Sequence, residues 1–303
     1  MSSHRHADLG HTVAGSTGMN SVYTSAEGAR ILAQQYTALL DQWPVPAERI
    51  RVPTRQGETF VMAGGPKEAA PLILLHGSGA NAAIWRDDVA LWAQHFRVYA
   101  VDLIGEPGLS APSRPALDSD AHAQWLDDVL EALAVRSAAF VGTSLGGWLA
   151  LDYAIRRPER VDRLALRCPS GIGRQKMGVL AASVFLLPFG HRGRRTMLNL
   201  ALGPAPSEAT ARERAFGEYV LLIHKHFRPR REKLPVFGDS ALETLGMPMQ
   251  VTLGGRDRLI DSHGTRRRLQ QTAPHASVRF LPEAGHLLKN QAQPVLDFLL
   301  TTE

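Results

Sequence analysis

Short apolar runs alternate with longer stretches of helical periodicity along most of the chain. The runs are rich in aliphatic residues and end at glycine or polar residues, which is typical of strands buried on both faces. The predicted strands are Pro71–His76, Phe96–Leu103, Ala138–Val141, Val161–Leu166, Met249–Leu253 and Ser277–Leu281. The predicted helices are Ala121–Leu133, Gly146–Arg156, Gly264–Thr272 and Ala292–Leu300. This alternation predicts an α/β fold with a mostly parallel central sheet flanked by helices.

Two parts of the chain depart from the alternation. Arg49–Ala63 reads as a hairpin with its turn at Gln56-Gly57, and we place it as an antiparallel edge before the parallel strands. From Ile172 to Leu242 there are only helical runs interrupted by proline and glycine, over a stretch too long for a simple connection. The sequence therefore predicts a core of residues 25–171 and 243–303, with residues 172–242 inserted as a helical cap.

The ends and the apolar segments bear on location. Residues 1–24 are rich in Ser, His and Gly, lack the apolar core of a signal peptide and are predicted to form a flexible N-terminal tail. The most apolar stretch, Met177–Phe189, is too short for an integral membrane segment and is predicted to be a buried or pocket-lining helix. The single cysteine, Cys168, cannot form an internal disulfide, so we expect a reducing, cytoplasmic location.

Composition and charge change this picture little. The chain has 303 residues, 44% of them hydrophobic and 21% charged, which is typical of a globular protein with a sizeable core. The net charge is +5, and only His191–Arg195 and His224–Lys233 form basic clusters. Neither cluster has the character of a nucleic-acid-binding motif, so no nucleic-acid partner is expected. A homodimer is compatible with all of these features.

The candidate chemistry centres on Gly142-Thr143-Ser144-Leu145-Gly146, a Gly-x-Ser-x-Gly motif between a predicted strand and a predicted helix. In such a motif the serine lies on a strained turn, and the glycines let strand and helix approach each other closely. The serine hydroxyl is then exposed at the carboxyl end of the strand. Ser144 is therefore the candidate nucleophile.

A serine hydroxyl needs a base and an acid that orients the base. His286 follows the last predicted strand and would reach the same edge of the sheet, whereas His263 reads as a helix-start residue and His275 precedes a strand. For the acid, Asp257 follows the strand Met249–Leu253 closely, and Asp261 reads as the cap of the next helix. We predict Ser144, Asp257 and His286 as the triad, with Asp261 as the competing acid.

Acyl transfer also needs donors for the oxyanion. One is expected from the backbone amide of Leu145, directly after the nucleophile. The second is expected in the loop that follows Pro71–His76, with the amide of Ser78 as first candidate and that of Gly79 as second. The sequence shows no convincing metal-ligand spacing and no dinucleotide-binding Gly-x-Gly-x-x-Gly, so neither a metal nor a cofactor is predicted.

These motifs together resemble the α/β-hydrolase superfamily. They occur in the order HGSG (His76–Gly79), GTSLGG (Gly142–Gly147), GGRD (Gly254–Asp257) and AGH (Ala284–His286). Three further stretches, QWPVP (Gln42–Pro46), VDLIGEPGLS (Val101–Ser110) and TSLGGW (Thr143–Trp148), are similar to bacterial carboxylesterases that include naproxen esterases.

That resemblance implies a serine hydrolase with Ser144 as nucleophile, His286 as base and Asp257 as its partner. The implied substrate is a small-molecule ester with a small or medium apolar acyl group. One alternative is a C–C bond hydrolase of the meta-cleavage type, which usually carries Asn and Trp where this chain has Thr143 and Leu287. Another is a non-catalytic small-ligand receptor on the same scaffold.

Overall fold

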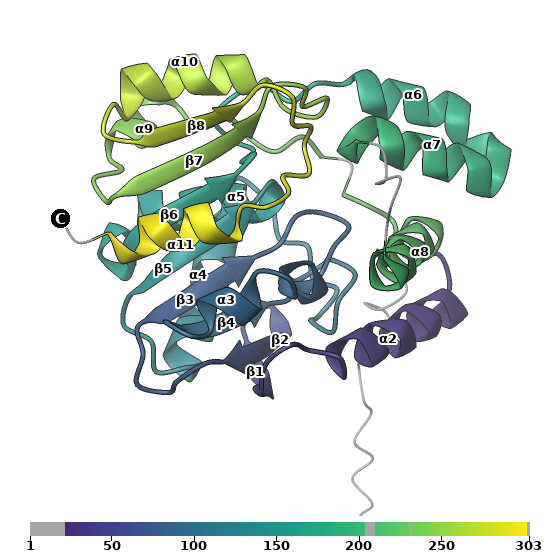
Figure 1. Cartoon of the computed structure of the whole chain (residues 1–303), viewed down its shortest axis with the longest axis horizontal. Helices are drawn as coiled ribbons and strands as arrows, with labels where there is room; N and C mark the ends of the chain where they lie inside the picture. The colour runs from purple at the N-terminus through teal and green to yellow at the C-terminus, as the bar shows by residue number, and fades with distance from the viewer. Residues whose placement is uncertain (1–21, 204–209, 231, 302–303) are drawn as a thin grey trace, which may run out of the picture.

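A single mixed sheet organises the molecule. The computed structural model describes residues 22–203, 210–230 and 232–301. Within these residues, the sheet has the strand order β1-β2-β4-β3-β5-β6-β7-β8 (Figure 1). The bounds of the strands are β1 Ala47–Thr54, β2 Gly57–Gly64, β3 Pro71–Leu75, β4 Arg97–Val101, β5 Ala138–Thr143, β6 Val161–Arg167, β7 Met249–Gly254 and β8 Ser277–Leu281. The pairs from β4 to β8 are parallel, and the β1–β2 and β2–β4 pairs are antiparallel.

The predicted α/β architecture is confirmed, with small shifts at strand ends. The antiparallel edge is present, but its turn lies one residue earlier than predicted, since Thr54 pairs with Gly57. Gly57 opens β2 with a φ of 97°, a left-handed conformation that favours glycine. The turn is therefore Arg55-Gln56.

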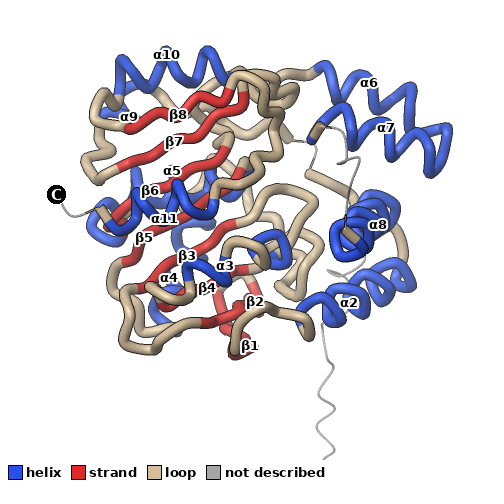
Figure 2. The backbone as a smooth tube through the Cα atoms, in the orientation of Figure 1, coloured by secondary structure: helices blue, strands red, loops and turns tan. Residues whose placement is uncertain are grey.

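Helices cover both faces of the sheet (Figure 2). Their bounds are α2 Ala26–Leu40, η1 Ala82–Trp85, α3 Val89–Trp92, α4 Ala121–Ala132, α5 Leu145–Arg156, η2 Pro158–Arg160, α6 Gly178–Leu186, η3 Leu187–Phe189, α7 Gly190–Leu202, α8 Ala211–His226, α9 Asp239–Glu243, α10 Ser262–Thr272 and α11 Ala292–Leu300. In β3, Leu72 and Leu74 pack in the layer that contains α3 and α11, and Ile73 and Leu75 pack in the layer that contains α4 and α5. This alternation explains why the strand reads as a continuous apolar run.

Between β6 and β7 the described chain forms α6, η3, α7, α8 and the short α9. Of these, α6, α7 and α8 lie together beyond one end of the sheet in Figure 1. The segment Met177–Phe189, predicted to be a buried or pocket-lining helix, is not buried along its whole length, because Val179 is buried but Met177, Phe185 and Phe189 are exposed. Among the described residues, no helix is both long enough and apolar enough to cross a bilayer.

Helix α8 is tied to the start of the described chain. The amide of Thr24 donates to the carbonyl of His226 at 2.8 Å, and the amide of Arg228 donates to the carbonyl of Val22 at 2.8 Å. Residues 1–21 of the predicted tail lie outside the described residues. The structure differs from the prediction after them, because Val22 and Tyr23 are buried.

Candidate active site

Ser144 lies on a sharp turn between β5 and α5. Its φ of 52° falls in the left-handed region that non-glycine residues rarely adopt. Glycine is required around it, since a Cβ at Gly146 would lie 2.0 Å from the carbonyl oxygen of Leu75, and one at Gly142 would lie 2.6 Å from that of Gly146. The amide of Ser144 donates to the carbonyl of Arg167 at 3.0 Å. The turn thus holds a partly exposed serine at the positive end of α5.

His286 and Asp257 form a buried pair at the same edge. The ring nitrogen Nδ1 of His286 lies 2.8 Å from Oδ2 of Asp257, and the side chains are 7% and 0% exposed. Asp257 follows β7 and His286 follows β8, so neighbouring parallel strands deliver both groups. The tautomer that fits this contact has the proton on Nδ1, which leaves Nε2 free to accept a proton.

Asp257 is held in its ionised form. Burial alone raises the pKa of Asp257. Its hydrogen bonds and the charge of His286 lower that pKa by more, so the pKa lies below its ordinary value. The largest lowering contribution comes from His286. The amides of Leu259 and Ile260 also donate to Oδ1 at 2.7 and 3.0 Å. A carboxylate fixed in this way can orient an imidazole and stabilise its protonated form.

The structure brings two of the three predicted triad residues into direct contact. In the described part of the chain, no hydrogen bond joins Ser144 Oγ to His286. Ser144 nevertheless lies at the same edge of the sheet, because its carbonyl accepts from the amide of Ser170 at 3.2 Å. Ser170 is two residues from Cys168, whose Sγ lies within 4.8 Å of ligand atoms of Asp257 and His286. Catalytic contacts are often long in unliganded enzymes and tighten with substrate.

The two predicted oxyanion donors are both available. Across residues that the structure describes, no hydrogen bond uses the amide of Ser78 or of Leu145. The amide of Gly79, the second candidate, donates to Oε2 of Glu106 at 2.6 Å. The loop also lies beside Ser144, since a Cβ at Gly77 would be 3.6 Å from Ser144 Cβ. Of the two candidates in this loop, Ser78 has a free amide among the described residues and Gly79 does not.

Two residues that the sequence offered as alternatives for the acid and the base, Asp261 and His263, make contacts that stabilise the fold. Asp261 caps α10, where its side chain accepts from the amide of Gly264 at 2.9 Å. The ring of His263 packs on Phe280 with the ring centres 4.9 Å apart. A further carboxylate, that of Asp102 directly after β4, is also buried and accepts from the amide of Leu109 at 2.8 Å.

Sequence reasoning missed two buried side chains beside the site. Glu106 contacts the loop of residues 76–82 that carries the predicted donor Ser78, which we call the oxyanion loop. Cys168 lies against the Asp257–His286 pair. A glutamate inside the apolar and glycine-rich stretch VDLIGEPGLS was the available signal for Glu106. Cys168 gave no signal beyond its place directly after a strand.

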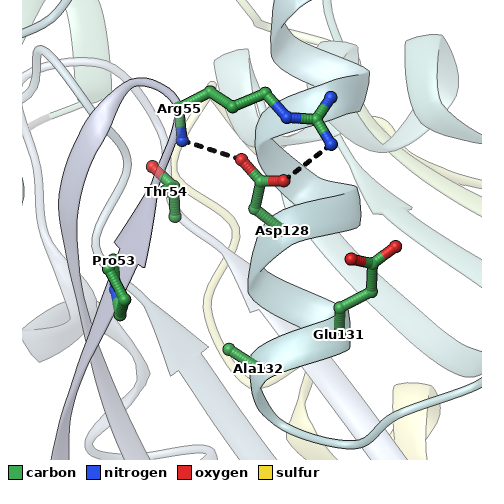
Figure 3. Close-up of a pocket in the computed structure, with 6 residues that line it drawn as sticks. All are labelled: Pro53, Thr54, Arg55, Asp128, Glu131 and Ala132. Carbon is green, nitrogen blue, oxygen red and sulfur yellow. Dashed lines mark hydrogen bonds and ion pairs between the residues drawn. The ribbon is translucent and has the colours of Figure 1, made fainter.

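A possible metal-ligand group coincides with this site, and a separate pocket lies elsewhere on the described structure. The one group of described residues that could bring three ligand atoms together is Cys168, Asp257 and His286, and two of these are already hydrogen-bonded to each other. Figure 3 shows a separate pocket between the β1 end and α4, where the amide of Arg55 donates to Asp128 at 2.8 Å. Its lining residues are Pro53, Thr54, Arg55, Asp128, Glu131 and Ala132.

Comparison with known proteins confirms the resemblance inferred from the sequence. A model described as the alpha/beta hydrolase family matches residues 72–297. The "uncharacterized carboxylesterase nap" of Bacillus subtilis is 30% identical over 270 residues, which is 84% of this chain and 86% of that protein. The crystal structure of carboxylesterase CesB (YbfK) from Bacillus subtilis matches with a TM-score of 0.80 and 28% identity, covering 92% of this chain and 100% of that chain. Naproxen esterase (carboxylesterase NP) from Bacillus subtilis matches with a TM-score of 0.78 and 26% identity, covering 91% and 97%.

The family model spans β3 to α11, so it includes the serine turn, the Asp257–His286 pair and the helical insertion. The structural match extends further and takes in most of the chain. The chain belongs to the α/β hydrolase family.

Proposed function

We propose that this protein is a serine carboxylesterase that cleaves esters of small or medium apolar acyl groups. The observation that carries the proposal is the buried hydrogen bond between His286 and Asp257 at the edge of the sheet where Ser144 lies on its strained turn. The similarity to Bacillus carboxylesterases over most of the chain supports the same reaction class.

In the proposed mechanism, Ser144 Oγ attacks the ester carbonyl carbon while Nε2 of His286 takes the hydroxyl proton. Asp257 fixes the imidazole and stabilises its positive charge. The oxyanion of the tetrahedral intermediate accepts from the amides of Ser78 and Leu145, and the loss of one such donor costs about 3 to 4 kcal/mol in the barrier.

The intermediate then collapses. The C–O bond to the alcohol breaks, and the leaving alkoxide takes the proton from His286. Water attacks the resulting acyl-enzyme with His286 as base, the bond to Ser144 Oγ breaks, and the free acid leaves with Ser144 reprotonated. The apolar cap segment around α6 is the part of the chain that would cover the acyl group.

The experiment that tests the proposal is turnover of p-nitrophenyl acetate and butyrate by the wild type and by Ser144→Ala. We expect the substitution to abolish turnover and the burst of p-nitrophenol. Equal rates in the two proteins would remove Ser144 from its role. No turnover by the wild type, together with tight binding of a small ligand, would favour the receptor alternative.

The C–C hydrolase alternative is tested with a vinylogous 1,5-diketone. The positions before the serine and after the histidine hold Thr143 and Leu287, which differ from the residues usual in that class. We expect slow or no cleavage of the diketone relative to esters.

A homodimer and a cytoplasmic location stay predictions, which sedimentation and cell fractionation would test.

A further inference from the structure

Glu106 is a buried carboxylate that contacts the oxyanion loop. It is 3% exposed, although glutamate is rarely buried without partners. Its Oε2 accepts from the amide of Gly79 at 2.6 Å and lies 3.3 Å from Oγ of Ser78. One contact is made through the Ser78 side chain and the other through the next peptide. Among the described residues, the amide of Ser78 donates no hydrogen bond.

The loop that carries Ser78 is fastened to the loop after β4 at several further points. Three hydrogen bonds join the two segments besides that of Glu106. They run from Leu103 N to His76 Nε2 at 2.9 Å, from Asn81 Nδ2 to Pro107 O at 2.8 Å and from Ala82 N to Asp102 Oδ1 at 2.8 Å. These bonds flank the loop at its two ends, whereas Glu106 contacts its middle.

The middle of the loop needs such a partner. Gly79 has a φ of 66°, in the left-handed region, and no described atom lies within 4 Å of its Cβ position. A glycine peptide without packing is conformationally permissive. The hydrogen bond from the amide of Gly79 to Glu106 fixes the Ser78–Gly79 peptide on the far side of Ser78. The Gly77–Ser78 peptide, which carries the Ser78 amide, is held on its other side by Nδ1 of His76, 2.8 Å from the carbonyl of Gly77.

From this geometry we propose that Glu106 is a positioning residue that holds the amide of Ser78 in place as an oxyanion donor. The inference rests on the proposed esterase function and extends it to a residue that does not touch the substrate. Donors that are already oriented stabilise a transition state without reorganisation during the reaction, so a misplaced donor lowers the rate of the chemical step.

The surroundings of Glu106 keep it able to accept a hydrogen bond. Burial raises its pKa to about 7, while the Gly79 amide, the positive charge of Arg114, the Ser78 hydroxyl and the charge of Arg230 lower it. Tyr23 also faces this charge. Both protonation states of a carboxyl group retain an acceptor oxygen for the amide. A glutamine would retain one as well, which gives a conservative variant.

The test compares Glu106→Ala, Glu106→Gln and a matched control. Asp152 is equally buried at 3% exposure and pairs with Arg156 on α5, away from the oxyanion loop, so Asp152→Ala controls for the loss of a buried carboxylate. We expect Glu106→Ala to lower kcat for p-nitrophenyl butyrate by about 10- to 100-fold with KM little changed. Glu106→Gln should recover most of that loss, and Asp152→Ala should keep the wild-type kcat.

A second measurement uses an alkyl trifluoromethyl ketone, which forms an oxyanionic adduct with a nucleophilic serine. Its inhibition constant should rise in Glu106→Ala in parallel with the loss of kcat, while inhibition by the neutral product alcohol should not change. Should Glu106→Ala not fold, Glu106→Asp, whose shorter carboxylate cannot reach Gly79, is expected to show the same loss.

Three results would overturn the proposal: an unchanged kcat in the folded Glu106→Ala or Glu106→Asp protein, a loss that appears only in KM, or an equal loss in Asp152→Ala. Ser144→Ala is assayed alongside. Turnover by Ser144→Ala at the wild-type rate would refute the proposed function itself, whereas a strongly impaired Ser144→Ala with a fully active Glu106→Ala would refute only the role of Glu106.

Discussion

The ring nitrogen Nδ1 of His286 lies 2.8 Å from Oδ2 of Asp257, although 29 residues separate them in the chain. The other oxygen of Asp257 accepts from two backbone amides, so both sides of the carboxylate have partners. The nearby Asp261 has its side chain committed to the start of α10. Asp257 and Asp261, four residues apart, therefore have different contacts. Substitution of the first is expected to affect catalysis, and substitution of the second is expected to affect only the start of α10.

We predict that Asp257→Asn lowers kcat about 10⁴-fold, because an amide can stabilise the wrong imidazole tautomer and carries no charge. Asp261→Asn should keep kcat near the wild-type value, since Asn also caps a helix well. Rates with p-nitrophenyl butyrate and far-UV circular dichroism check both variants. A large loss of activity confined to Asp261→Asn would mean that the acid was assigned to the wrong residue.

Much of the fold could be predicted because its signals are local. Apolar runs marked the strands from β3 to β8, and the Gly-x-Ser-x-Gly motif marked the turn at Ser144. Helix α2 was missed even though Gly28, Leu32, Tyr36 and Leu40 are buried at four-residue spacing. Helix α2 packs on α8, which is distant in the chain. No neighbouring stretch of the sequence therefore indicated what the apolar face of α2 packs against.

The contact between Asp257 and His286 was predictable to a similar extent. Chain order and strand ends indicated His286 and Asp257, and the structure confirms that they touch. The role of Glu106 could not be read from the chain, because its contact with Gly79 spans 27 residues and depends on how two loops meet. The exposure of Met177, Phe185 and Phe189 could not be predicted either, because hydrophobic periodicity does not show which face of a helix a neighbouring helix covers.

We predict opposite effects for alanine at two helical glycines. Gly146 packs so closely on β3 that a Cβ would lie 2.0 Å from the Leu75 carbonyl, so Gly146→Ala must displace the start of α5 and with it the Leu145 amide. We expect a loss of about 100-fold or more in kcat and a lower Tm. In α8, no atom of the described residues lies within 4 Å of the Cβ position of Gly217, and Gly217→Ala should raise stability by about 0.5 to 1 kcal/mol.

The glycine pair is checked by thermal unfolding and ester turnover on both variants. Wild-type activity in Gly146→Ala would show that the turn tolerates a side chain and would contradict the packing argument. A destabilised Gly217→Ala would show that α8 needs conformational freedom at that position.

The buried Asp102 predicts a specific pH dependence of stability. Burial raises its pKa from 3.8 to about 6, even though the amides of Leu109 and Ala82 and the hydroxyl of Tyr36 lower it. The folded protein therefore binds more protons at this group than the unfolded chain between these two values. Its contribution to stability is present at low pH and is lost as the pH rises through about 6.

Asn at position 102 removes this titration, so the comparison isolates it. The free energy of unfolding of the wild type minus that of Asp102→Asn should fall by about 2 to 3 kcal/mol between pH 4 and pH 7. Urea unfolding of both proteins across this range gives the difference directly. A difference that stays constant, or that grows with pH, would contradict the raised pKa.

The thiol of Cys168 is expected to be unreactive in the native protein although it lies beside the active-site pair. It is fully buried, and burial followed by the negative charge of Asp257 raises its pKa above the ordinary value. Because the thiolate is the reactive form, iodoacetamide should not label Cys168 at pH 8 and should leave ester turnover unchanged. In urea the same reagent should label the residue completely, as mass spectrometry would detect. Inactivation of the native wild type, abolished by Cys168→Ser, would instead show that the reagent reaches the thiol in the folded protein.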